Sequence, residues 1–182
     1  MHYDGLKHYL ISYRDFPQKL NLEFLEFLQE WEIATVTGWN NNDLLWDDHR
    51  SYVGRPGSVG NRAGNFAVQL SDFVLIIGCR LNIRQVSFNW QSFAKNAWTC
   101  HVDIDLDELE KPTLNTNLKI QGDIKNFFNR LSKSVQSKIN SNKYKNKKKI
   151  WKNWILFNKD LLSEFPATLP CKKINNQLIN PY

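Results

Sequence analysis

The stretch that most constrains the fold is DFVLIIGCRL, in which nearly continuous apolar residues run from Phe73 to Gly78. A strand that is apolar at every position, and not at alternate ones, is typical of a parallel sheet covered on both faces. WTCHVDIDL and LKIQGD predict two similar strands, and EIATVTGW predicts a short one over residues 33–37. HYLISY is a weaker candidate for another strand, and one more short strand is expected to end near Val53.

Helical patterns separate these strands. In QKLNLEFLEFLQEW, apolar residues recur at helical spacing from Leu20 to Trp31. NRAGNFAVQLS predicts a helix over residues 61–70, and IKNFFNRLSKSV predicts an amphipathic helix after the last strand. Strands and helices that alternate through short connections predict an α/β fold with a mainly parallel sheet.

The C-terminal part of the sequence has a different character. Eight lysines and no acidic residue lie between Lys133 and Lys152, so this segment carries +8 of a total net charge of +6 and the remainder carries −2. Such a segment indicates either a nucleic-acid patch or a solvated linker, and the lack of arginine and of interleaved aromatic residues favours the linker. A helix should follow, with one apolar face formed by Ile150, Trp154, Phe157 and Leu161.

Several classes of protein are disfavoured by composition. No run approaches eighteen apolar residues, and the N-terminus lacks the features of a signal peptide, so the expected compartment is the cytoplasm and no membrane partner is expected. Cys79, Cys100 and Cys171 are too scattered for a disulfide framework or a zinc site, and the first two are expected in the core. The four histidines lack metal-ligand spacing, so no metal site is predicted.

The segment YVGRPGSVGNRAGN contains four glycines, at Gly54, Gly57, Gly60 and Gly64. Their spacing differs from the dinucleotide-binding pattern GxGxxG, although a helix follows them. Backbone N–H groups in such a loop can bind a phosphate, but glycines that only turn the chain fit the pattern as well.

Charged residues follow two of the predicted strands. Arg80 comes after Gly78, where it could bind an anion or pair with an acid such as Asp72 or Asp103. VDIDLDE places acids at the end of a strand, where they could accept hydrogen bonds from a ribose, cap a helix or, least favoured, bind magnesium. No nucleophile and base are suggested by spacing, so the residues alone indicate a nucleotide- or anion-binding α/β domain without a catalytic group.

The motifs YVGRPG, AGNFAVQLSD, GCRLNIRQ, VDIDLDELEKP and QGD occur in one order over residues 33–131. In this combination the sequence resembles the central domain of thiamine-diphosphate-dependent enzymes, with acetolactate synthase and its relatives as the nearest group. The resemblance implies a Rossmann-like, mainly parallel sheet of about five to six strands flanked by helices, with a C-terminal helical linker. We therefore expect this domain over residues 1–135, and a basic hinge, a helix and an interdomain linker over residues 136–182.

The same resemblance implies a set of cofactor-binding positions. Residues 57–60 fall where the family's loop approaches a flavin, Gly78 and Arg80 follow the central strand, and the acids face an adenosine. The full set is Gly57, Ser58, Val59, Gly60, Gly78, Arg80, Asp103, Asp105, Gly122 and Asp123.

Two departures count against FAD. The family's GMHG loop is GSVG in this sequence, and no glycine occurs between Gly5 and Gly38, where the turn after the first strand would lie.

The resemblance also implies what the chain lacks. Complete enzymes of the family add a pyrimidine-binding domain with an activating glutamate and a diphosphate-binding domain that holds magnesium. We expect the chain to be a fragment of such an enzyme, not catalytic alone, whose oligomeric parent decarboxylates a 2-oxo acid and transfers the product. The alternative is a stand-alone module that binds FAD or an adenine nucleotide. Nucleic-acid binding is disfavoured.

Overall fold

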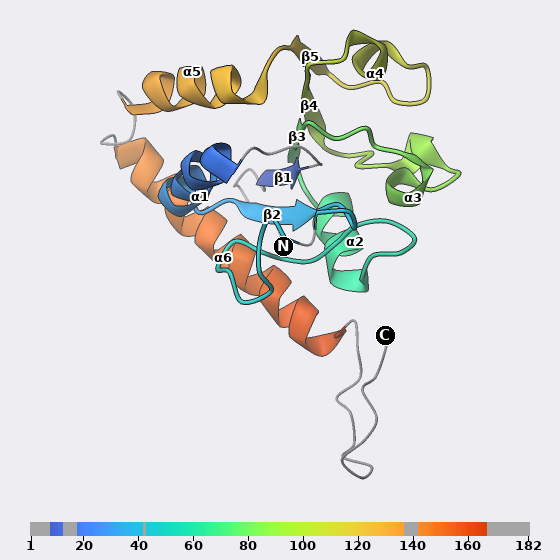
Figure 1. Ribbon diagram of the computed structural model, residues 1–182. Helices are drawn as coiled ribbons and strands as arrows, with labels where there is room; N and C mark the ends of the chain where they lie inside the picture. The colour runs from blue at the N-terminus through green and yellow to red at the C-terminus, as the bar shows by residue number, and fades with distance from the viewer. Residues whose placement is uncertain (1–7, 13–17, 42, 137–141, 167–182) are drawn as a thin grey trace.

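Five parallel strands form a single sheet in the order β2-β1-β3-β4-β5 in the computed structural model, which describes residues 8–12, 18–41, 43–136 and 142–166 (Figure 1). The α/β class and the parallel sheet flanked by helices are confirmed. The strands are β1 (His8–Ser12), β2 (Ala34–Thr37), β3 (Phe73–Ile77), β4 (Trp98–Asp103) and β5 (Leu118–Gln121). The helices are α1 (Gln18–Trp31), α2 (Arg62–Gln69), α3 (Ile83–Val86), α4 (Leu106–Glu110), α5 (Ile124–Gln136) and α6 (Asn142–Glu164), with a 3₁₀ turn over Trp90–Ser92.

The strand order reverses direction at the middle of the sheet. The weak candidate strand is β1, and it pairs with β2 on one side and with β3 on the other, so that Tyr9 is in register with both Ala34 and Val74. The chain thus moves outward to β2, returns to β3 beside β1, and continues outward through β4 to β5. Of the strand expected near Val53, the structure has one bridge, between Thr35 and Tyr52.

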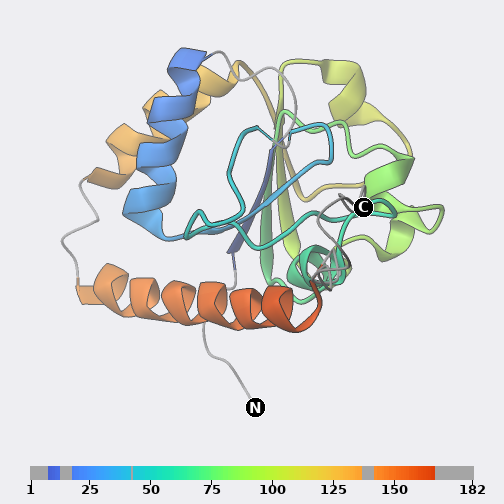
Figure 2. The ribbon, with the colours of Figure 1, turned by 60° about the horizontal axis from the view of Figure 1, so that its bottom comes forward.

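Helices cover both faces of the sheet, as Figure 2 shows with the sheet nearly edge-on. On one face α1 and α5 pack together, and Phe24, Phe27 and Leu28 of α1 are buried against Leu75 and other apolar residues. On the other face lies α2, with α6 packed along it. This arrangement explains why β3 is apolar at successive positions, because its side chains are buried on alternate faces.

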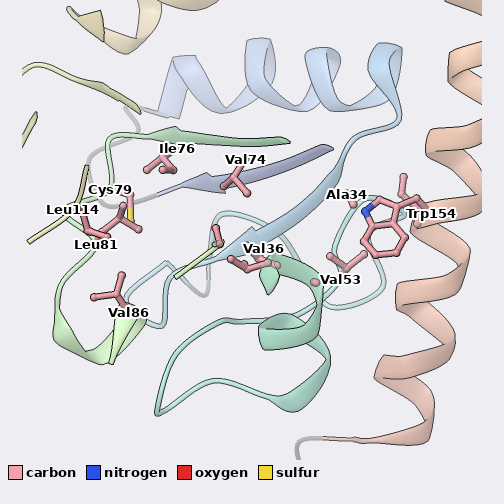
Figure 3. Packing of buried hydrophobic residues seen from close by; sticks show 14 residues of the cluster. Ala34, Val36, Val53, Val74, Ile76, Cys79, Leu81, Val86, Leu114 and Trp154 are labelled. Carbon is pink, nitrogen blue, oxygen red and sulfur yellow. The ribbon is translucent and has the colours of Figure 1, made fainter. Parts of the chain in front are cut away.

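The second face contains the cluster drawn in Figure 3. Val74 and Ile76 of β3 and Val36 of β2 pack there with Val68 of α2, while Trp154 of α6 lies beside Ala34 at the edge of the sheet. Apolar side chains from elements more than a hundred residues apart thereby form one core. Cys79 and Cys100 are buried free thiols, as the sequence predicts.

The apolar face predicted for α6 is wrong in part. Trp154 is buried, but Phe157 is 45% exposed, whereas Trp151 and Asn158 are buried. Aromatic contacts set the rotation of the helix, since Trp151 stacks on Trp31 of α1 with ring centroids 6.1 Å apart. Phe157 stacks on the neighbouring Trp154 and does not enter the core.

Candidate functional site

The predicted residues that follow β3, β4 and β5 lie together at the carboxyl edge of the sheet. Backbone hydrogen bonds join these strand ends, from Gly78 N to Val102 O at 2.8 Å and from Gly122 N to Asp103 O at 2.9 Å. Parallel strands end at the same edge, and their ends are the usual ligand-binding place in open α/β sheets. The structure therefore brings Gly78, Arg80, Asp103, Asp105, Gly122 and Asp123 to one region, where their use by a ligand stays a prediction.

The acids after β4 have local structural roles. Asp103 Oδ1 accepts a hydrogen bond of 3.0 Å from the amide of Asp105, and Asp105 Oδ1 accepts one of 3.0 Å from the amide of Asp107. Asp105 is thus the N-cap of α4, with Asp107 and Glu108 in the first turn, where negative charge is stabilised by the helix. This arrangement confirms the helix-capping alternative for Asp105, with Asp107 and Glu108 as the acidic first-turn residues.

Arg80 has a different acidic neighbour from those predicted. Its Nε lies 3.6 Å from Glu108 Oε1. Lys111 Nζ lies 2.8 Å from Glu108 Oε2 and also contacts the carbonyl oxygen of Arg80. Glu108 thereby links the turn after β3 to α4, and an anion at this edge would compete with its carboxylate for the exposed guanidinium of Arg80.

His101 is a residue that spacing in the sequence did not single out. Its Nε2 donates to the carbonyl oxygen of Cys79 at 2.9 Å and lies 4.0 Å from Asp103 Oδ2. Burial lowers the pKa of His101, while the nearby Asp103 opposes the shift. The ring is therefore neutral near pH 7, with its proton on Nε2. Because side chains alternate along a strand, His101 and Asp103 lie on the same face of β4. This spacing of two residues is the feature of the sequence from which their proximity could have been predicted.

The turn after β5 is open at its glycine. A Cβ built on Gly122 would meet nothing within 4 Å. Asp123 Oδ1 accepts a hydrogen bond of 3.0 Å from the amide of Asn126 and so caps α5. The free space at Gly122 is consistent with a position that a ligand could approach closely.

The loop that contains Gly54, Gly57 and Gly60, called the glycine loop below, differs from this open turn. Its backbone N–H groups form hydrogen bonds with other protein groups. Gly57 N donates to Asn65 Oδ1 at 2.8 Å, Ser58 N donates to Arg84 O at 2.7 Å, and Gly60 N donates to Gly57 O at 3.1 Å. A phosphate cradle needs such N–H groups directed at the ligand. In this loop, these three N–H groups bind neighbouring protein atoms instead.

Packing explains why glycine occupies two of these positions. Gly57 has a φ of +106°, and a Cβ there would lie 2.1 Å from Arg84 O. A Cβ on Gly60 would lie 2.1 Å from Arg55 O. Both distances are far below any van der Waals contact, so these glycines serve the turn and its close packing against α3. Val59, by comparison, is exposed.

The hydrogen-bonding roles of two asparagines at the start of α2, Asn61 and Asn65, were also not predicted from the sequence. Asn61 is the N-cap, and its Oδ1 accepts from Gly64 N at 2.7 Å and from Arg55 N at 3.3 Å. Asn65 donates from Nδ2 to Gly57 O at 3.1 Å. The place of Asn61 just before the predicted helix was a usable N-cap signal, but the return of the loop onto Asn65 was not visible in the sequence.

Within the described ranges, no group of three or more His, Cys, Asp or Glu side chains is arranged to hold a metal ion. None of the helices in that part of the chain is both long and apolar enough to cross a membrane. Residues 13–17, which follow β1 where the resemblance implies a glycine-rich turn, lie outside the described residues.

Comparison with known proteins identifies the domain. The family model for the thiamine pyrophosphate enzyme central domain matches residues 18–131. A probable acetolactate synthase large subunit of Methanococcus aeolicus is 30% identical over 136 residues, which are 74% of this chain and 22% of that protein. The acetolactate synthase large subunit of Lactococcus lactis is 33% identical over 59% of this chain and 18% of its own length. Isozyme 2 of Escherichia coli is 34% identical over 63% of this chain and 20% of its length.

The chain thus spans about a fifth of the length of these curated relatives. The matched region contains β2 to β5 together with the glycine loop and the strand-end residues described above. Because the family match extends over well more than half of the chain, the chain belongs to the family of thiamine pyrophosphate enzyme central domains.

Proposed function

We propose that the chain is a non-catalytic central domain of an acetolactate-synthase-like enzyme. The observation that carries the proposal is the family match over residues 18–131, joined to relatives of which the chain covers about a fifth. The strand-end acids support it, since Asp103, Asp105 and Asp123 accept hydrogen bonds from backbone amides and thereby hold the turns after the strands in place. The domain would serve as a scaffold between catalytic domains.

The catalytic parts would come from partners. We infer that a pyrimidine-binding domain and a diphosphate-binding domain, on the same parent protein or on separate chains, supply the activating glutamate and the magnesium-diphosphate site. The parent would be an oligomer in the cytoplasm that decarboxylates a 2-oxo acid and transfers the resulting two-carbon unit. The described residues do not fit a magnesium site, because no suitable group of ligands occurs among them.

An activity assay tests this function. The purified 182-residue chain, incubated with thiamine diphosphate, Mg²⁺ and pyruvate, should release no carbon dioxide above the protein-free rate. A complete acetolactate synthase in the same buffer is the positive control. Sustained decarboxylation by the purified chain would refute the proposal, since it would require a cofactor site within these residues.

A second candidate is a module that binds FAD or an adenine nucleotide at the carboxyl edge. The open space at Gly122, at the same edge of the sheet as the exposed Asp105 and Arg80, favours it. Isothermal titration with ADP and with FAD distinguishes the two candidates, because a pure scaffold gives no binding heat with either ligand.

Variants sharpen that titration. Asp105→Asn keeps a good N-cap for α4 but removes the carboxylate that a ribose would use. If an adenine nucleotide binds there, this variant should lose most of its affinity while its unfolding midpoint stays near that of the parent chain. Equal affinities of the variant and the parent would exclude the proposed contact.

A further inference from the structure

One side of α6 packs on the rest of the molecule, and the other side is exposed. Figure 2 shows the helix along the periphery, with α1 and α2 on the same side of it. On this inner side Trp151 stacks on Trp31 of α1, and Trp154 and Ile155 belong to the core. Six exposed residues recur every three or four positions on the opposite side, and we call them the outer face: Lys145, Lys149, Asn153, Leu156, Asp160 and Glu164.

The outer face is basic in its first half and acidic in its second half. Lys145 and Lys149 lie before its centre, and Asp160 and Glu164 lie after it. The two charges of each half are four residues apart, so they repel each other along the helix. No ion pair among the described residues includes any of the four. Each half therefore has a local charge that its own chain does not neutralise there.

The order of these charges is also unfavourable for a helix on its own. The partial charges at the ends of a helix stabilise acidic residues near its start and basic residues near its end. α6 has the reverse order, because Lys145 lies close to its start at Asn142 and Glu164 is its last residue. Another molecule that brought an acid to the start and a base to the end would offset both effects.

A second α6 that runs antiparallel supplies such charges at matching positions. When the two helices are aligned at the peptide between Trp154 and Ile155, Lys145 is level with the partner's Glu164. In the same alignment, Lys149 is level with the partner's Asp160. A twofold axis repeats each contact, so four pairs of opposite charge form between two copies of the chain.

The centre of the outer face is apolar. Leu156 is 52% exposed, and the adjacent Phe157 is 45% exposed. Phe157 is held in place by its stacking on Trp154, with ring centroids 5.3 Å apart. In the antiparallel alignment these side chains of both copies lie near the twofold axis, where their burial removes apolar surface from water. An apolar centre bordered by charged residues is a usual composition for a protein interface.

A loop beside the second half of α6 adds acidic charge at one edge. Burial lowers the pKa of Lys159, and the charge of Asp48 opposes this shift, so the exposed Asp48 lies near Lys159. Lys152 is exposed and lies about two turns before Lys159 on the same edge of the helix. The twofold axis brings this edge of one copy beside the same edge of the other. Lys152 therefore approaches the partner's Asp48.

We propose that the outer face of α6 is a self-complementary docking surface, through which two copies of the chain pair with antiparallel helices. Lys145 and Lys149 of each copy face Glu164 and Asp160 of the other. An interface built mainly on one helix is smaller than the standard size, so the dimer is weak. The proposal goes beyond the scaffold function by assigning a partner and a surface, and its tests do not depend on the outcome of the pyruvate assay.

The first experiment is sedimentation velocity of the 182-residue chain at low salt. A monomer–dimer equilibrium should appear between about 5 and 300 µM, a range suited to weak association. The dimer should dissociate as sodium chloride is added, because the screening length falls from about 10 Å at 0.1 M to about 3 Å at 1 M.

Two charge-reversed chains test the pairing directly. The acidic chain is Lys145→Glu/Lys149→Glu, and the basic chain is Asp160→Lys/Glu164→Lys. Each should lose roughly tenfold or more in self-association, because repulsion replaces attraction in four contacts. An equimolar mixture of the two should form a dimer again, since all four contacts are then attractive. Both changes give α6 the charge order that the helix dipole favours, so unfolding of α6 does not explain the loss.

The matched control is Lys95→Glu/Lys125→Glu. It makes the same change in net charge as the acidic chain, at exposed positions outside α6. Its self-association should equal that of the parent chain. A loss as large as that of the acidic chain would show that net charge, and not the outer face, governs association.

Cross-linking identifies the partner residues. A carbodiimide joins a carboxylate to an amine without a spacer, so the two groups must be in contact. Lys149 and Asp160 are eleven residues apart in one helix, about 16 Å along its axis, and cannot be joined within one chain. Mass spectrometry of the cross-linked dimer should therefore contain a peptide that joins Lys149 to Asp160.

Three results would overturn the proposal. The first is a chain that remains monomeric over the whole concentration range, including one that instead sediments with a DNA duplex. The second is a mixture of the acidic and basic chains that forms no dimer. The third is a cross-linked dimer whose intermolecular peptides contain no residue of α6.

Discussion

The amide nitrogen of Ser58 donates a 2.7 Å hydrogen bond to the carbonyl oxygen of Arg84, and the hydroxyl group of Ser58 donates to the same oxygen at 3.2 Å. This double contact joins the glycine loop to α3. The guanidinium of Arg84 lies 5.1 Å from the ring centroid of Trp39. This contact joins the segment after β2 to α3 as well. The loop is thus fixed from both sides by protein groups.

Gly57→Ala should destabilise the chain. The φ of +106° alone accounts for roughly 1–3 kcal/mol of the free energy of unfolding, and the contact of 2.1 Å between the new Cβ and Arg84 O adds to it. Gly122→Ala is the matched control, because its Cβ would meet nothing within 4 Å, and we expect a change within about 0.5 kcal/mol. Urea unfolding followed by tryptophan fluorescence measures both variants. Equal effects of the two substitutions would contradict the packing role of Gly57.

The stability of the chain should decrease below pH 6.5 because of His101. Burial is the largest cause that lowers its folded-state pKa from the ordinary value of 6.5. The unfolded chain therefore binds a proton at higher pH than the folded chain does, so the free energy of unfolding falls as the pH drops below 6.5. It levels off once the folded imidazole is protonated as well. His49 contributes in the same direction.

The measurement for His101 is a series of urea unfolding curves from pH 8 to pH 5. In His101→Gln the side chain can still donate to Cys79 O but does not titrate, so the decrease in stability below pH 6.5 should be smaller than in the parent chain. Identical pH dependence of the two proteins would exclude His101 as a source of the effect.

Cys79 and Cys100 should resist alkylation in the folded chain. Burial raises the pKa of Cys79 to about 12 and that of Cys100 to about 11, so few thiolates form at pH 8. Iodoacetamide treatment at pH 8, followed by peptide mass spectrometry, should leave both unmodified unless urea is present. Rapid modification of Cys79 without urea would contradict its burial beside Gln85.

Trp151→Ala should destabilise the chain by about 3–5 kcal/mol, the usual range for a buried tryptophan. Trp151 is 4% exposed and contacts Trp31 at 6.1 Å and Tyr144 at 5.8 Å between ring centroids. Trp46, which is 58% exposed, is the matched control, and its replacement by alanine should have a small effect. Thermal unfolding followed by circular dichroism measures both, and similar midpoints for the two variants would refute the role of Trp151.

Sequence patterns predicted the elements well because most of them depend on local periodicity. The continuous apolar run at β3 reflects helices on both faces, and the spacing of Phe24, Phe27 and Leu28 marks the buried side of α1. The residues gathered at the carboxyl edge were also predictable, since Gly78, Asp103 and Gly122 each follow a recognisable strand and parallel strands end together.

Contacts between distant segments were not predictable in this way. Nothing in the spacing of the glycines indicates that Arg84 O would lie against Gly57, or that Asn65 would engage both backbone groups of that glycine. The face of α6 was mistaken for a similar reason. Its rotation depends on Trp31, which lies more than a hundred residues earlier in the sequence.

β1 has a consequence for how the chain can be shortened and how it folds. The family match begins at residue 18, whereas residues 8–12 lie between β2 and β3. Trimming the protein to its matched region would remove β1. The sheet would then be divided into β2 alone and a separate group formed by β3, β4 and β5. During synthesis, moreover, β1 can pair with β3 only after the ribosome has released Phe73, the residue of β3 that is in register with His8. Such long-range pairing is slow, and β1 thus makes the completion of the sheet a late step for the nascent chain.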